Sequence, residues 1–117
     1  MNNRATVIEN LIHFSLPLDE LQRQARDFDW DFEGLPIVLT LNHIVHVLDR
    51  YLCGELTASI VEQWANLIEG REDISFDEMH EEWIAATIHE LANPLLTAQL
   101  EAKRARELIA EAIEPKR

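Results

Sequence analysis

The sequence predicts an all-α fold, a compact antiparallel bundle of five to six helices in a single domain over residues 1–117. Apolar residues recur at the three- and four-residue spacings of amphipathic helices along much of the chain. Only three Gly and four Pro occur among the 117 residues, which favours long helices over a turn-rich β fold. Apolar residues make up 47% and charged residues 27%, as in ordinary globular domains. A chain of this length buries a core without metal or disulfide staples.

Three helices are expected in the first half of the chain. The first covers residues 4–14, and a second, 17–28, begins at Pro17, a residue suited to the first turn of a helix. The third runs from about Leu39 to Cys53. It stops at Gly54, because glycine readily adopts the left-handed conformation that ends helices.

The fourth and last helices are defined by their ends and faces. Thr57 is expected to cap a helix over 58–69, which Gly70 ends. The last helix, about 98–113, has a face rich in alanine. Small side chains permit close approach, so this face is expected to contact a neighbouring helix or, in a homodimer, a second copy of the chain.

The fifth helix has the clearest start signal in the sequence. Ser75 with Glu78 three residues later forms a capping-box pattern, and Ile74 is placed to pack against Met79 as a hydrophobic staple. Both patterns predict that Ser75 is the N-cap. Asn93-Pro94 predicts the end of the helix.

The charge balance narrows the classes of partner. The chain has 22 acidic and 10 basic residues, a net charge of −12, and residues 1–100 hold 18 of the acids but only five of the bases. Binding to nucleic acid or anionic membrane is therefore disfavoured, since both depend on clustered Lys and Arg. Solubility alone explains such a charge, but so does a surface that receives a basic protein partner. The densest acidic segment is 69–82, and its candidate partner-binding residues are Glu69, Glu72, Asp73, Asp77, Glu81 and Glu82.

A histidine pair supports the alternative hypothesis of a metal-binding domain or metal-dependent enzyme. His43 and His46 have HxxH spacing, and Asp49 is one turn further on. Helical periodicity places both histidines on the outward face. Arg50 shares that face and opposes a cation, so we predict no metal. His80 falls among apolar residues and is expected to be a neutral core histidine.

No catalytic motif is recognisable. The sequence lacks a Ser-His-Asp arrangement, a glycine-rich phosphate loop and a zinc-ligand pattern, so we expect no enzyme and no cofactor. Cys53, the single cysteine, lies at a predicted helix C-terminus, where the helix dipole disfavours a thiolate. One cysteine, no membrane-length apolar run and no signal peptide predict a cytoplasmic protein.

The stretch DFDWDFEG, residues 27–34, alternates acidic and aromatic residues. Read as a calcium loop it fails, because position 6 is Phe32 rather than Gly and position 12 is Val38 rather than Glu. We expect an extended strap in which Trp30 covers the end of the core and Asp31 is free to act as a cap or to bond backbone amides near the turn. Exposed aromatic rings would instead indicate a docking strip for a partner.

Several blocks resemble a group of small uncharacterised bacterial helical proteins. These are YLCGELTASIVEQWANLIEGREDISF (51–76), IHELANPLLTAQL (88–100), LTLNHIVHVLDRYL (39–52) and Trp30-Asp31. The resemblance implies a helical fold and carries no activity. In size, charge and class the chain is also similar to immunity proteins, which implies a non-enzymatic inhibitor of a basic toxin. An acidic nucleic-acid mimic is a further alternative.

Overall fold

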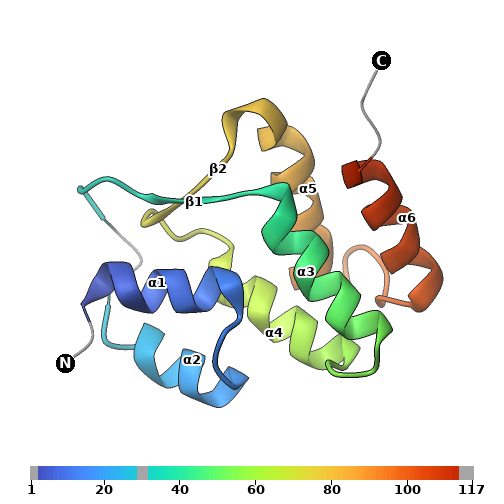
Figure 1. Cartoon of the computed structure of the whole chain (residues 1–117), viewed down its shortest axis with the longest axis horizontal. Helices are drawn as coiled ribbons and strands as arrows, with labels where there is room; N and C mark the ends of the chain where they lie inside the picture. The colour runs from blue at the N-terminus through green and yellow to red at the C-terminus, as the bar shows by residue number, and fades with distance from the viewer. Residues whose placement is uncertain (1–2, 29–31, 114–117) are drawn as a thin grey trace.

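The chain begins with a helical hairpin, α1 (Arg4–His13) and α2 (Leu18–Ala25) (Figure 1). The computed structural model describes residues 3–28 and 32–113. Asn3 caps the start of α1, and its side chain accepts a hydrogen bond from the Thr6 amide, 2.8 Å away. Phe14 follows the helix as its C-cap, with a left-handed φ of 49°. This turn returns the chain so that α2 packs beside α1.

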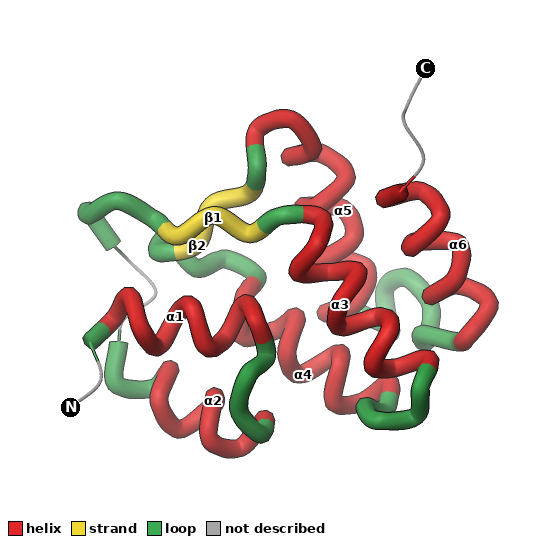
Figure 2. Tube along the Cα trace, in the orientation of Figure 1, coloured by secondary structure: helices red, strands yellow, loops and turns green. Residues whose placement is uncertain are grey.

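A small parallel sheet follows, which corrects the all-α prediction. Strand β1 (Ile37–Leu39) pairs in parallel with β2 (Ile74–Phe76), residue 37 opposite 74 and 39 opposite 76 (Figure 2). Parallel strands need a long crossover, and here the crossover consists of helices α3 (Leu41–Leu52) and α4 (Ala58–Ile68). Leu39, expected to begin the third helix, is instead a fully buried strand residue. The domain is therefore mostly helical with a two-stranded sheet.

The predicted start of the fifth helix is also wrong. Ser75 belongs to β2, and the side chain that caps the following turn is that of Asp77, which accepts a hydrogen bond from the Met79 amide at 3.2 Å. A 3-10 turn, η1 (Glu78–His80), then leads into α5 (Glu81–Ala92). No staple forms, since Ile74 is buried in the sheet while the Met79 side chain is 84% exposed.

The core lies where the helices meet around Trp64 of α4. This side chain is fully buried, donates from Nε1 to the Leu11 carbonyl at 2.7 Å, and stacks on Phe14 with ring centroids 6.2 Å apart. Helix α4 packs against α5, and α6 (Ala102–Ile113) packs against α3. The six α-helices of the described residues are thus joined around one apolar core.

Two further helices are shorter than predicted. Helix α2 ends at Ala25 rather than residue 28, and α6 begins at Ala102 rather than residue 98.

In the part of the chain that the structure describes, no helix combines the length and apolar character needed to cross a bilayer.

Candidate functional site

Asp73, one of the six predicted partner-binding residues, is buried rather than presented at the surface. Its carboxylate is 1% exposed and accepts two hydrogen bonds from the Arg71 guanidinium, at 2.9 and 3.1 Å. Arg4 of α1 adds a third contact at 2.9 Å. Because these arginines engage its carboxylate inside the fold, Asp73 joins α1 to the segment before β2.

The same arginines contact Phe28 and Phe32 of the 27–34 segment. Arg71 lies 3.4 Å from the Phe28 carbonyl, and the Arg4 guanidinium lies over the rings of Phe28 and Phe32, 5.2 and 4.6 Å from their centroids. Both rings are half-buried. The predicted positions of Trp30 and Asp31 fall outside the described residues.

Glu69 is a surface residue with partners of its own. It follows α4, and its carboxylate contacts His89 Nδ1 at 2.8 Å and accepts from the Asn93 amide at 3.0 Å. These contacts join the end of α4 to the end of α5. Glu69 therefore belongs to the acidic surface, but its carboxylate already contacts His89 and Asn93.

Glu72 and Asp77 lie near opposite ends of the sheet. Glu72 is exposed, and one of its oxygens is 3.4 Å from the Phe32 amide nitrogen. Asp77 follows β2, and its amide donates to the Leu39 carbonyl at the end of β1, 3.0 Å away. The segment thus places carboxylates both before and after β2.

A hollow at the start of α5 gathers the remaining acids. It has a volume of about 270 Å³, and it is open to solvent. Met79 contributes an 84% exposed side chain, and the half-buried Trp83 contributes an indole whose Nε1 donates to Glu111 of α6 at 2.9 Å. The hollow thus combines acidic and apolar groups, and its lining residues are Glu78, Met79, His80, Glu81, Glu82 and Trp83.

Sequence reasoning missed part of this hollow. The sequence pattern assigns Glu78 to a capping box and Met79 to a staple, and both devices require a helix that begins at Ser75. His80, expected in the core, is half-buried at the N-terminus of α5. Because the helix start was predicted at Ser75, the sequence did not show that Met79 is exposed beside three glutamates.

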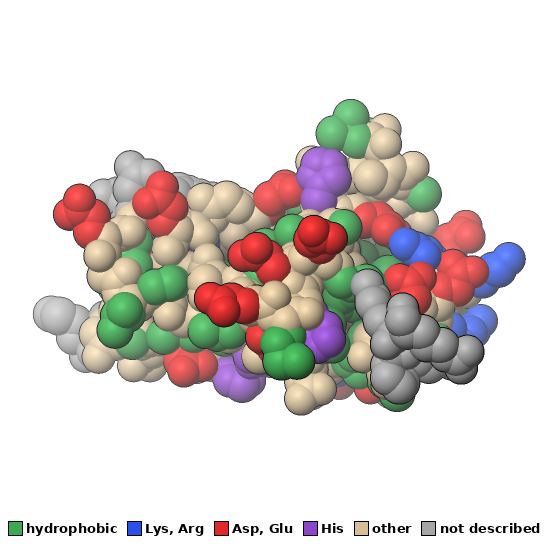
Figure 3. All heavy atoms as spheres, turned by 90° about the horizontal axis from the view of Figure 1, so that it is seen from above, with side chains coloured by type: hydrophobic (Ala, Val, Ile, Leu, Met, Phe, Trp, Pro, Cys, Tyr) green, Lys and Arg blue, Asp and Glu red, His purple; other side chains and the backbone are tan. Residues whose placement is uncertain are grey.

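The acidic character extends over the face above the sheet. In Figure 3 acidic side chains are scattered across this face, while the clearly visible Lys and Arg side chains lie toward the right of the view. Within 69–82 the single base is Arg71, which is 1% exposed and bonded to Asp73. The exposed carboxylates of this segment consequently have no exposed basic residue of the same segment beside them.

His43 and His46 differ in their exposure and in their contacts. His43 is half-buried, its Nδ1 accepts a hydrogen bond from the Thr40 amide at 2.9 Å, and its ring meets that of His13 edge-on with centroids 4.6 Å apart. His46 and Asp49 are exposed. The expectation that both histidines point outward is thus met by His46 alone. Among residues 3–28 and 32–113, no group of three His, Cys, Asp or Glu is placed to hold a metal ion.

Burial lowers the pKa of His43 below its ordinary value, and the nearby His13 and His46 lower it further, while Glu9 opposes them. The neutral imidazole is the form that accepts the Thr40 amide proton. The geometry and the direction of the pKa shift therefore agree.

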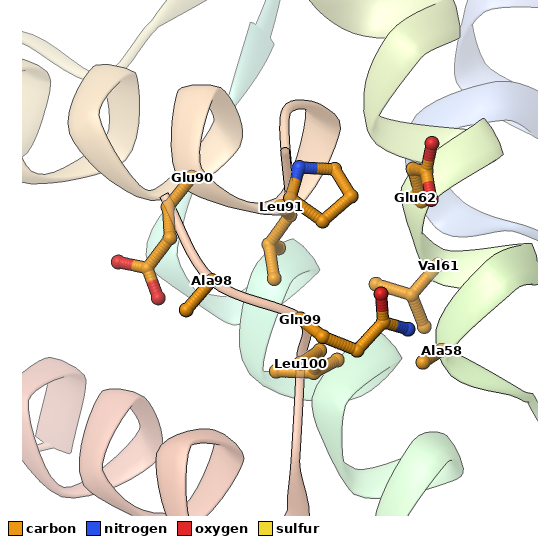
Figure 4. A pocket seen from close by; sticks show the side chains of 9 residues that line it. Ala58, Val61, Glu62, Glu90, Leu91, Ala98, Gln99 and Leu100 are labelled. Atoms are coloured by element: carbon orange, nitrogen blue, oxygen red, sulfur yellow. The ribbon is translucent and has the colours of Figure 1, made fainter. Parts of the chain in front are cut away.

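A second hollow, between α4, α5 and the 98–100 segment, is too small for a substrate (Figure 4). Its volume is about 10 Å³, close to the minimum for one water molecule. The Glu90 carboxylate points away from it in Figure 4 and pairs with Arg104 at 2.7 Å. This hollow presents no catalytic pair.

The alanine-rich face of the last helix is occupied within the chain. Helix α6 packs on α3, with Ala105 and Leu108 buried and Ile113 68% exposed. The close approach expected of small residues thus occurs with a neighbouring helix. A homodimer through this helix stays a prediction.

Comparison with known proteins gave no match to a family model, to a curated protein or to a solved structure.

Proposed function

We propose that this chain is a non-enzymatic binding domain that captures a basic protein through its acidic surface. This surface is defined by Glu69, Glu72, Asp77, Glu78, Glu81 and Glu82, with Asp73 omitted because it is buried. An immunity-type or inhibitory role fits such a domain, since a basic target is drawn to an acidic surface and held by complementary charge.

The observation that carries the proposal is the exposed Met79 inside the acidic hollow. Solubility alone explains exposed glutamates, and Met79 adds an 84% exposed apolar side chain beside them. Methionine is flexible and polarizable, and it is common at surfaces that adapt to a partner. A hollow that surrounds it with Glu78, Glu81 and Glu82 suits a basic residue with an apolar stem, such as Lys or Arg.

The test compares two variants with the same change in net charge. One carries Glu78→Gln, Glu81→Gln and Glu82→Gln; the control carries Glu9→Gln, Asp49→Asn and Glu101→Gln, all at exposed positions away from the hollow. Each tagged protein captures partners from cells that make the natural protein, and mass spectrometry quantifies them. If each of the three charges contributes about 0.3 kcal/mol to binding, their loss predicts roughly fivefold weaker capture by the first variant.

The control variant should retain wild-type capture, because its changes leave the hollow intact. Equal partner profiles for all three proteins would reject the acidic surface. Thermal melts accompany the comparison, since Glu81 and Glu82 lie in the first turn of α5 and favour the helix dipole.

A further inference from the structure

The outer edge of β1 is an unpaired strand edge in the described part of the chain. The Ile37 amide donates to the Asp73 carbonyl at 2.9 Å, and the Leu39 carbonyl accepts from Asp77 at 3.0 Å, so residues 37 and 39 direct these groups toward β2. Peptide groups alternate in direction along a strand. The N–H and C=O of Val38 therefore point to the opposite edge.

Residues at and just before this edge are exposed to solvent. Strand β1 passes in front of β2 in Figures 1 and 2, and no described helix is drawn in front of β1. The Val38 side chain is 47% exposed, and Leu35, just before the strand, is 92% exposed. A backbone edge flanked by apolar side chains is what an extended peptide requires to add a strand.

Acidic residues near this edge favour a basic peptide over a second copy of the chain as the added strand. Exposed Glu33 and Glu72 belong to the loops that enter β1 and β2, and Asp77 and Glu78 follow β2. A second copy of the chain would bring the same carboxylates together across the new pair, and like charges on neighbouring strands are destabilising. A strand with lysine or arginine side chains meets complementary charge at both ends.

We propose that β1 pairs along its outer edge with a short extended segment of a basic protein, which completes a three-stranded sheet. The inference rests on the proposed function, whose partner it describes more closely. Main-chain hydrogen bonds to Val38 hold the segment, and its cationic side chains reach the flanking carboxylates. The three-residue length of β1 limits the pairing to a few residues, so charge supplies much of the selectivity.

Three synthetic peptides with blocked ends test the pairing. The first is a heptamer that alternates lysine and valine, the second replaces lysine by glutamate, and the third is the lysine peptide with N-methyl groups on alternate backbone nitrogens. N-methylation preserves charge and removes the donors needed for strand pairing. Affinities come from fluorescence anisotropy, and amide exchange of Val38 is followed by NMR.

The lysine peptide should bind and slow exchange of the Val38 amide, and the glutamate peptide should not bind. The N-methylated peptide should bind about tenfold more weakly, as expected for one or two lost hydrogen bonds of about 1 kcal/mol each. Val38→Pro removes the outward N–H, while the bonds made by Ile37 and Leu39 remain. This variant should therefore bind the unmethylated and the N-methylated lysine peptides with similar affinity. The peptide series needs no mutant, and it decides the question even if Val38→Pro fails to fold.

Equal affinity for the methylated and unmethylated lysine peptides, with unchanged Val38 exchange, would overturn strand pairing while leaving an acidic binding surface in place. Absence of binding by the lysine peptide would also overturn it, whereas the proposed function is decided by the capture experiment with the glutamate variants. Protection of Val38 that rises with protein concentration alone would assign the edge to a second copy of the chain and reject the basic segment.

Discussion

Asp73 and Arg71 form a two-point ion pair in which both side chains are 1% exposed. Two residues apart in sequence, they lie in the turn between α4 and β2, and Arg4 reaches the same carboxylate from α1. The pair therefore fixes the entry of β2 relative to the first helix. Asp73, which the sequence predicted to bind a partner, therefore stabilises the fold instead.

Asp73→Asn should lower the free energy of unfolding by about 3–5 kcal/mol, because it leaves buried Arg71 without its counter-charge. Urea denaturation followed by circular dichroism measures the change. Glu72→Gln, at the exposed neighbouring position, is the matched control and should stay within about 0.5 kcal/mol of wild type. A loss below about 1 kcal/mol in Asp73→Asn would show that the pair contributes little beyond its packing.

Stability should depend on pH through His43. Its folded-state pKa is lowered by burial, so the unfolded chain takes up this proton at a higher pH than the folded chain. The contribution of the neutral imidazole is complete above the ordinary histidine pKa of about 6.5. It is lost as the pH falls from there toward the folded-state pKa. Protonation also removes the acceptor of the Thr40 amide bond.

Denaturation midpoints between pH 7.5 and 5 test this dependence. His43→Gln should show a smaller loss of stability on acidification than wild type, because this titrating group is gone. The control is His80→Gln, which removes a histidine of η1 that is not among the groups shifting the pKa of His43. Parallel pH profiles for wild type and His43→Gln would contradict the assignment.

Trp64→Phe should cost about 1–3 kcal/mol in unfolding free energy, mainly because the Leu11 carbonyl loses the buried indole N–H that lies 2.7 Å from it. The aromatic stacking on Phe14 can persist in this variant. Thermal unfolding by circular dichroism measures the loss. The half-buried Trp83 provides a comparison, since its indole bonds exposed Glu111 and Trp83→Phe should cost less. Equal losses would show that burial of the bond has no effect.

Periodicity in the sequence predicted where the helices lie, because their apolar faces pack into the core. Thr57 caps α4 as expected, accepting a hydrogen bond from the Ile60 amide at 3.1 Å. The strands were missed because each has three residues, too few for a period of two to be distinguished from the margin of a helix. Their pairing is a contact between residues 37 positions apart, as Ile37 and Ile74 are, and local patterns do not encode it.

The candidate site could be predicted only in part, because local sequence patterns do not show which side chains meet in the fold. Glu72, Asp77, Glu81 and Glu82 are not buried, as their polarity suggests, whereas Asp73 is buried where neighbouring Arg71 and the distant Arg4, 69 residues away, both meet its carboxylate. Composition shows that a segment is acidic, whereas only the fold shows which carboxylates are already paired.

Ser75 and Asp77 provide the sharpest comparison between the sequence pattern and the structure. If Ser75 capped the fifth helix, Ser75→Ala would cost about 1 kcal/mol, the usual loss for an N-cap. The structure places Ser75 in β2 and gives the capping bond to Asp77, whose Oδ1 accepts from the Met79 amide. Asp77→Ala should therefore cost about 1 kcal/mol and Ser75→Ala less than about 0.5 kcal/mol. Urea denaturation of the two variants in parallel measures both losses, and the reverse order would restore the capping box at Ser75 and remove β2.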